Sequence, residues 1–244
     1  MTLAPDTEDR IASHWAERLG CPATAFEGPG VTVAESPTDG TVRLFRRRGS
    51  LVVAAPAEVR EALADHRETL READLPAVES VECALADLGR RVETVHGPYF
   101  LGYVDEPSFS PADTEARLLV GADEPAFDRL RERVPDEEWA RASPVFRPGQ
   151  TAGTFENGDL VAAGTLTHLP FPDVGVVVDP EYRGRGYGRA VVSKITATAF
   201  DVDPNAIVRY RTEASLVASV GLAESLGYER WATSAVLVLG QGSP

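Results

Sequence analysis

Residues 174–199 read VGVVVDPEYRGRGYGRAVVSKITATA, and this stretch decides the fold. The four valines at its start are β-branched, so they favour a buried strand over a helix. Asp179-Pro180 ends the strand, because proline has no N–H to donate to a sheet. From Arg189 onward, apolar residues recur at three- and four-residue spacing, which predicts a helix. Three glycines lie between the strand and the helix: Gly184, Gly186 and Gly188.

A strand, a glycine-rich loop and a helix in this order predict an anion-binding site. Glycine tolerates positive φ and lets a ligand approach the backbone. The N–H groups of the first helical turn point into the loop, and the helix dipole adds partial positive charge. Arg183, Arg185 and Arg189 add full charges, so the expected ligand is a di- or polyphosphate. The alternative is an ordinary surface turn, which the buried strand feeding the loop disfavours.

Two familiar phosphate motifs are excluded by the spacing. The P-loop pattern G-x-x-x-x-G-K-[ST] does not occur in the chain. The dinucleotide pattern G-x-G-x-x-G would need its third glycine at Val191. The loop therefore belongs to another class of phosphate site.

The spacing Arg183-x-x-Gly186-x-Gly188, preceded by Val178-x-Pro180, resembles the acetyl-CoA signature of the GNAT N-acetyltransferase superfamily. The resemblance implies an α/β (α+β) fold with a GNAT-type mixed central sheet flanked by helices. It also implies acetyl-CoA as cosubstrate, an amine as acceptor and no metal.

The resemblance continues downstream and covers about residues 116–240. Residues 209–213 (RYRTE) resemble the family's next strand, and residues 219–228 (SVGLAESLGY) resemble its following helix and exit turn. We therefore predict a GNAT domain at 111–244. Residues 1–110 are predicted to form an additional α+β domain, either a degenerate GNAT half or a cap over the acyl site.

In GNAT enzymes the central strand and the next strand splay apart, and the pantetheine arm of CoA bonds to the central strand's backbone. By resemblance, the pyrophosphate lies on the amides of residues 184–189. The implied cofactor-binding residues are Val176, Val177, Val178, Arg183, Gly184, Arg185, Gly186, Tyr187, Gly188 and Arg189.

Acyl transfer to an amine needs a general base, and groups that stabilise the oxyanion and the leaving thiolate. The family often supplies the base from the strand that carries acetyl-CoA. Asp173, at the start of that strand, is the first candidate, and Glu213, at the end of the following strand, is the second. The structural alternative for Asp173 is an ordinary loop aspartate. The alternative for Glu213 is an acid placed at a helix N-terminus, where the helix dipole favours it. His168 is a further possible base, and Glu138 a possible pocket residue.

The chain departs from the family at two positions. Ala223 stands where a tyrosine often protonates the thiolate, and Leu216 stands where an asparagine is usual. The proton must then come from water or from another residue such as Ser219, unless none is needed. The alternative functions are a non-catalytic acyl-CoA-binding regulatory protein and an acyltransferase that uses a longer acyl-CoA.

Composition narrows the partners and the compartment. The chain has 244 residues, 38 of them acidic and 24 basic, for a formal charge of −14. This charge disfavours nucleic acid or an anionic membrane as partner. Cys21 and Cys83 form no C-x-x-C pair, and the four histidines have no metal-ligand spacing. Without a signal sequence or a spanning segment, we expect a cytoplasmic protein, either monomer or homodimer.

Periodicity and turn residues predict the remaining elements. In the first half these are a helix at 7–19, a hairpin of strands 41–45 and 51–55, helices at 57–71 and 76–88, two short strands within 92–104 and a linker at 107–111. The arginines at 46–48 are interpreted as a solvated turn, with a second phosphate patch as the alternative. In the second half they are a strand at 117–120, two helices from 124 and 135, a hairpin across Asn157-Gly158, a strand at 206–212, a helix at 215–226 and a strand at 231–239.

Overall fold

The computed structural model describes residues 2–36, 40–167 and 170–241. The chain divides into two compact units that are interleaved in sequence. Unit 1 comprises Met1–Leu3, Gly102–Arg211 and Ala218–Glu229, and unit 2 comprises Ala4–Leu101, Thr212–Val217 and Arg230–Pro244. The predicted domain boundary at residue 110 remains a prediction. The two compact units have other boundaries along the chain.

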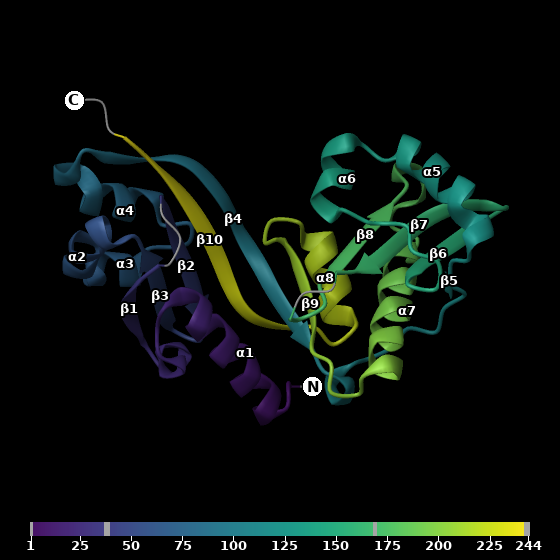
Figure 1. Ribbon diagram of the computed structural model, residues 1–244, viewed down its shortest axis with the longest axis horizontal. Helices are drawn as coiled ribbons and strands as arrows, with labels where there is room; N and C mark the ends of the chain where they lie inside the picture. Colours follow the sequence, from purple (N-terminus) through teal and green to yellow (C-terminus); the bar gives the residue numbers. More distant parts are fainter. Residues whose placement is uncertain (1, 37–39, 168–169, 242–244) are drawn as a thin grey trace. The chain divides into compact units, whose positions relative to one another are not determined.

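Unit 1 is built on a four-stranded antiparallel sheet in the order β5-β6-β7-β8 (Figure 1). Its strands are β5 (Arg117–Leu118), β6 (Thr151–Glu156), β7 (Asp159–Leu166) and β8 (Val174–Val178). The predicted turn at Asn157-Gly158 joins β6 to β7, and both residues have positive φ, 50° and 88°. Two-residue hairpin turns of this kind match the twist of the strands.

Helices cover both faces of this sheet. On one face, Phe127 and Leu130 of α5 (Glu124–Arg133) pack with Leu160 and Val177. On the other face, Val191 and Ile195 of α7 (Tyr187–Val202) pack with Ala152 and Ala162. Side chains alternate along β8, so Val177 lies in the first core, and Val174, Val176 and Val178 lie in the second. The third helix, α6 (Asp136–Ala142), lies so close to β8 that a Cβ at Gly175 would stand 2.2 Å from the Ala142 carbonyl oxygen.

Unit 1 also holds most of β9 (Val208–Glu213) and α8 (Val217–Ser225). The helix is followed by Gly227, whose φ of 91° favours glycine after a helix end. The predicted order of the second half, β-α-α-β-β-β-α-β-α-β, is confirmed from β5 to β10.

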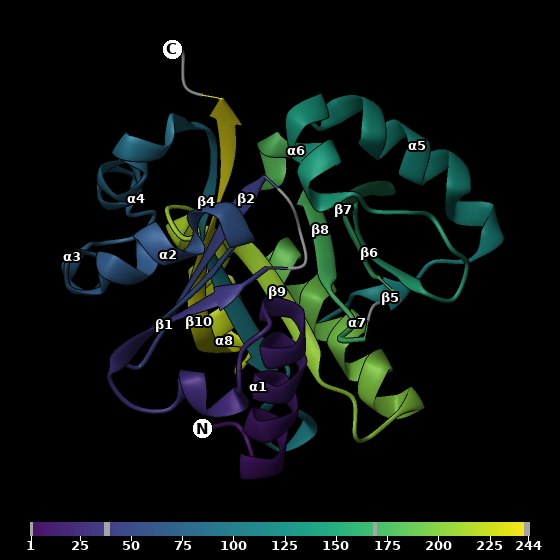
Figure 2. The same cartoon turned by 60° about the vertical axis from the view of Figure 1, so that its left-hand side comes forward.

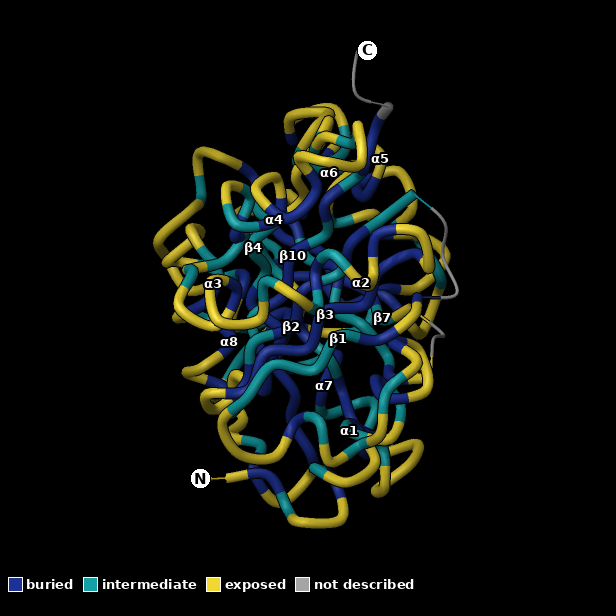
Figure 3. Tube along the Cα trace, turned by 90° about the vertical axis from the view of Figure 1, so that its left-hand side faces the viewer, coloured by how far each residue is buried: buried dark blue, intermediate teal, exposed yellow. Residues whose placement is uncertain are grey.

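Unit 2 has a sheet with neighbouring strands β1-β3-β2-β10-β4. Figure 2 labels β1, β2, β10 and β4 of this sheet. Its strands are β1 (Gly30–Glu35), β2 (Thr41–Arg47), β3 (Ser50–Ala55), β4 (Arg90–Val104) and β10 (Glu229–Gln241). Strands β1 and β3 are parallel, whereas β2 is antiparallel to both β3 and β10. Strand β3 is buried along its whole length (Figure 3).

Helix α1 (Pro5–Leu19) covers one face of this sheet, where Trp15 packs on Phe45 with ring centroids 4.6 Å apart. The opposite face carries α2 (Ala57–Asp65), α3 (Arg67–Glu72) and α4 (Val78–Leu85), whose apolar residues form one core with β2, β3 and β10. The C-terminal strand β10 therefore belongs to the same sheet as the N-terminal hairpin.

Three sequence predictions are corrected in this part of the chain. The helix predicted at 57–71 is divided, because His66 leaves helical geometry with φ −100° and ψ 21°. Residues 92–104 form part of the single strand β4 instead of two short strands. The solvated turn at 46–48 is correct for Arg48, but Arg47 is only 7% exposed and its guanidinium bonds to Glu8 at 2.9 Å.

The segment predicted as a linker at 107–111 is packed. Asp105 caps a short 3-10 helix at Glu106–Ser108, and Ser110 donates its N–H to the Leu226 carbonyl at 3.0 Å. A Cβ at Gly227 would stand 2.1 Å from the Ser108 carbonyl oxygen. This close contact explains why a loop rich in serine and proline is held in place here.

Candidate functional site

Strand β8 has one edge paired with β7 and one open edge. Asp179 donates its N–H to Val161 at 2.9 Å, and Thr167 donates to the carbonyl of Asp173 at 3.0 Å. Because hydrogen-bonding direction alternates along an antiparallel strand, the odd-numbered residues of β8 bond to β7. The even-numbered residues direct their N–H and C=O groups towards the other edge. Val176 and Val178 therefore present backbone groups there, whereas the backbone of Val177 is engaged with β7.

The strand next to this edge, β9, meets β8 only at its beginning. A parallel bridge joins Asp173 to Arg209, and Arg209 donates its N–H to Pro172 at 2.8 Å. No further pairing between β8 and β9 occurs among the described residues. The backbone edge of β8 beyond residue 174 is consequently open to an extended ligand.

The glycine loop continues directly from β8 into α7. Gly184 and Gly186 have φ of 75° and 87°, and a Cβ at either position would meet nothing within 4 Å. Gly186 is the N-cap of α7, and no side chain caps this helix start. The first-turn amides of a 16-residue helix thus face an open loop, as an anion site requires.

Gly188 is required for a different reason. A Cβ there would lie 3.1 Å from Cγ2 of Val178 and 3.2 Å from Cδ1 of Leu222. The absence of a side chain lets α7 pack closely on the end of β8 and on α8. The third glycine of the motif therefore sets helix packing, and the first two set loop geometry.

The three arginines of the loop are each engaged in the structure. The guanidinium of Arg183 bonds to Glu138 of α6 at 2.6 Å and to the Val178 carbonyl at 3.4 Å. Arg185 stacks over the ring of Tyr182 at 5.2 Å, and Arg189 reaches the Ser225 carbonyl at 3.5 Å. These contacts are exposed, so an arriving phosphate can compete for the side chains.

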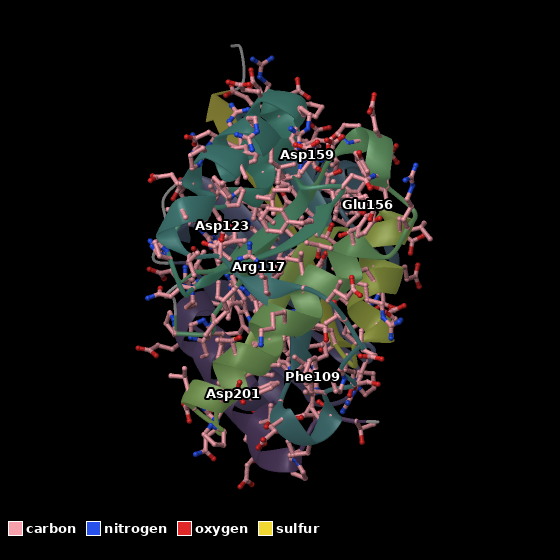
Figure 4. The ribbon with its side chains drawn as sticks, turned by 90° about the vertical axis from the view of Figure 1, so that its right-hand side faces the viewer. Phe109, Arg117, Asp123, Glu156, Asp159 and Asp201 are labelled. Atoms are coloured by element: carbon pink, nitrogen blue, oxygen red, sulfur yellow. The ribbon has the colours of Figure 1, made fainter. Side chains whose placement is uncertain are left out.

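Tyr187, at the first position of α7, donates a hydrogen bond of 2.7 Å to the carboxylate of Glu156. This bond raises the pKa of Tyr187, because only the protonated phenol can donate it. Glu156 and Asp159 flank the β6–β7 turn (Figure 4). The hairpin end is thereby tied to the helix start that forms the anion site.

The first candidate base, Asp173, lies in an ion pair. Its Oδ2 accepts from Arg209 at 2.9 Å, and the two side chains are 15% and 13% exposed. Its Oδ1 is buried and has no hydrogen-bond partner among the described residues. Asp173 therefore combines a fixed orientation with one acceptor atom that no described group satisfies.

The other candidates are placed differently. Glu213 ends β9, is half-buried and belongs to unit 2, while Asp173 belongs to unit 1. Glu138 is bound to Arg183, and His168 lies outside the described residues. No group of three or more metal-ligating side chains is found in the described parts of the chain.

The sequence reasoning did not predict a buried hydroxyl network beside the open edge. Tyr210 of β9 bonds to Ser219 of α8 at 3.0 Å, and Tyr228 bonds to Thr196 of α7 at 2.6 Å. The two tyrosine rings meet edge to face, with centroids 5.5 Å apart. Burial raises the pKa of both tyrosines. Alternation along β9 could have indicated Tyr210, because it places this side chain opposite Arg209.

Part of the chain matches a known protein family. Residues 116–228 match the sequence model of the Acetyltransferase (GNAT) family. No curated protein matches the chain significantly. None of the helices in the described residues is long and apolar enough to cross a membrane.

Several solved structures are similar to the chain. A GNAT-family acetyltransferase from Novosphingobium aromaticivorans is 27% identical, with 64% of this chain and 69% of that chain covered and a TM-score of 0.46. A GCN5-related N-acetyltransferase from Kribbella flavida is 18% identical, with 99% and 98% covered and a TM-score of 0.49. A GNAT acetyltransferase from Colwellia psychrerythraea is 16% identical at a TM-score of 0.47; 64% of this chain is covered, and the match spans 60% of that protein's length.

Proposed function

We propose, from the premise that residues 116–228 are an acetyltransferase domain of the GNAT family, that the protein transfers an acetyl group from acetyl-CoA to a primary amine of a small molecule, peptide or protein. The observation that carries the proposal is the open edge of β8 followed directly by an uncapped helix start. A pantetheine arm and a pyrophosphate need these two features in this order. A cytoplasmic location, where acetyl-CoA is available, is part of the proposal.

In this proposal the backbone of Val176 and Val178 bonds the pantetheine amides as an added strand would. The amides of residues 184–189 hold the pyrophosphate, and Arg183, Arg185 and Arg189 supply the surrounding positive charge. Val177 contributes through its side chain, which packs in the core beneath the strand. Tyr187 orients the helix start through Glu156.

Asp173 is the proposed general base, with Glu213 as the second candidate. The ion pair with Arg209 holds the Asp173 carboxylate in place, and Oδ1 has an acceptor site for the proton of the attacking amine, directly or through a water. We expect Asp173→Asn to lower kcat by about 10²–10⁴-fold, the range for loss of a general base, with acetyl-CoA affinity unchanged. If Glu213→Gln has this effect and Asp173→Asn does not, the base is Glu213.

Calorimetric binding of acetyl-CoA to the parent and to Gly186→Asp tests the cofactor site. The matched control is Gly149→Asp, because Gly149 also has positive φ (77°) and open space around it, away from the loop. Both variants place an aspartate, and so one negative charge, at a position with positive φ and open space around it. The proposal predicts binding by the parent and by Gly149→Asp, and loss of binding only in Gly186→Asp.

Release of free thiol in the presence of an amine panel tests the reaction itself. A parent that neither binds acetyl-CoA nor releases thiol contradicts the proposed function. A parent that binds acetyl-CoA but releases no thiol with any amine of the panel supports the regulatory alternative, which Ala223 favours because that position has no hydroxyl. A preference for longer acyl-CoA supports the remaining alternative.

A further inference from the structure

The hydroxyl groups of Tyr210 and Ser219 form a pair on the face of the sheet that carries α7. Tyr210 is 3% exposed, Ser219 is half-buried, and their oxygens are 3.0 Å apart. The ring of Tyr210 packs against Tyr228, whose hydroxyl bonds to Thr196 of α7. The neighbouring residue, Arg209, forms the bridge to Asp173, and no later residue of β9 pairs with β8 among the described residues. Tyr210 therefore stands at the point where the two strands part.

Either hydroxyl of the pair can donate to the other, and the burial of the phenol favours Tyr210 as the donor. A buried phenol needs an acceptor for its proton, and Ser219 is the acceptor that the described residues provide for Tyr210. Burial also raises the pKa of Tyr210, which keeps the phenol protonated. With Tyr210 as the donor, the proton of Ser219 turns away from the tyrosine.

Helix α8 packs against the end of β8. Leu222 lies one turn after Ser219 and reaches the same point as Val178, since both stand within 3.2 Å of the Cβ position at Gly188. Ala223 lies one turn after Ser219 as well, is fully buried and carries no polar atom. Ser219 consequently carries a hydroxyl one turn before the point where α8 reaches the end of β8.

We infer that Ser219 donates a hydrogen bond to the sulfur of the CoA leaving group, and that Tyr210 is the positioning residue that orients it. This inference rests on the proposed function. In the step, the amine nitrogen bonds to the acetyl carbon, the carbon–sulfur bond breaks, and the electron pair stays on sulfur as a thiolate. Ser219 stabilises that charge by hydrogen bonding while keeping its proton. The amine proton passes to the base, and water later protonates the thiolate.

Steady-state kinetics of four variants test the inference. Ser219→Ala should lower kcat about 10–100-fold, the effect of losing one hydrogen bond to a charged group, with little change in the acetyl-CoA KM. Ser219→Thr, which retains the hydroxyl, should recover most of the activity. Tyr210→Phe should lower kcat by less, and should add nothing in the Ser219→Ala background, because it acts through Ser219. Equal activity of Ser219→Ala and an active parent overturns the inference and leaves the proposed function intact.

Titration of the thiol of bound CoA gives a readout that needs no amine. Thiolate absorbance in the ultraviolet should appear at lower pH in the parent complex than in the Ser219→Ala complex, because the hydrogen bond favours the charged sulfur. The matched control is Thr196→Val, which removes a hydroxyl bonded to Tyr228 on the far side of the network. Identical titrations of parent and Ser219→Ala overturn the inference, as does failure of the parent to bind CoA, which contradicts the proposed function too.

Discussion

Asp173 and Arg209 are joined twice, once by the backbone bridge between β8 and β9 and once by an ion pair of 2.9 Å. The bridge ends the contact between the strands, and the ion pair fixes the side chains at the same point. By alternation along β9, the side chain of Arg209 lies on the opposite face of that strand from the side chain of Tyr210. The place where the strands part is thus flanked by charge on one face and by hydroxyl groups on the other.

The ion pair predicts a large cost for removing one partner. We expect Asp173→Asn to lower the free energy of unfolding by about 3–5 kcal/mol, because Arg209 would be left as a buried cation without its carboxylate. Urea denaturation of parent and variant measures the difference. The double variant Asp173→Asn/Arg209→Met should be more stable than Asp173→Asn alone, and a double variant that is less stable would contradict this account.

The ion pair between Arg183 and Glu138 predicts a change in affinity. Its side chains are 45% and 40% exposed, so Glu138→Gln should cost at most about 1 kcal/mol of stability. The variant should bind acetyl-CoA more tightly, because Arg183 no longer has a competing carboxylate. Asp136→Asn is the matched control: it removes the same charge from α6, but its partner is Arg131. Calorimetry that shows equal tightening in both variants would assign the effect to net charge alone.

The glycines of the loop predict two different responses to alanine. Gly184→Ala should cost about 1–2 kcal/mol through left-handed backbone strain. Gly188→Ala should cost about 1–3 kcal/mol through overpacking against Val178 and Leu222. In a Leu222→Ala background the cost of Gly188→Ala should fall, whereas that of Gly184→Ala should not. Thermal and urea unfolding of the three single and two double variants distinguish the two causes.

The sequence predicted the second half well because each element there has a strong local signal. Four valines, a proline and three glycines mark β8, its end and the loop, and Asn157-Gly158 marks the hairpin. The element order followed from these signals, as did the resemblance to the GNAT family, whose model residues 116–228 match. Where local signals were weak, as at His66 and in the strand interrupted by Gly97-Pro98, the predicted boundaries were wrong.

The contacts of the site could not be predicted in the same way. The pairing of Arg209 with Asp173 and of Tyr210 with Ser219 depends on which residues of β9 lie opposite β8 and α8. That register is set by tertiary packing, and no turn residue in the intervening segment encodes it. The division of β8 into bonded and open backbone groups likewise required the register with β7.

The buried tyrosines predict how stability depends on pH. Tyr210 and Tyr228 are 3% and 1% exposed, and burial raises the pKa of each in the folded state. The unfolded chain loses these protons near pH ~10, while the folded chain keeps them. The unfolded state then binds fewer protons, so the free energy of unfolding falls as pH rises above about 10 and is unaffected by these groups at lower pH.

A pH jump to 11.5 followed by absorbance at 295 nm tests this prediction. Exposed tyrosines should ionise within the dead time, and at least two of the six should ionise only at the rate of unfolding. Tyr210→Phe and Tyr228→Phe should each reduce the slow amplitude by one tyrosine, because each removes one buried phenol. The matched control Tyr182→Phe, at a half-buried position in the loop, should leave the slow amplitude unchanged. Ionisation of all six tyrosines within the dead time, in protein that remains folded by circular dichroism, would show that the two phenols are open to solvent and would remove the basis for Tyr210 as a neutral donor to Ser219.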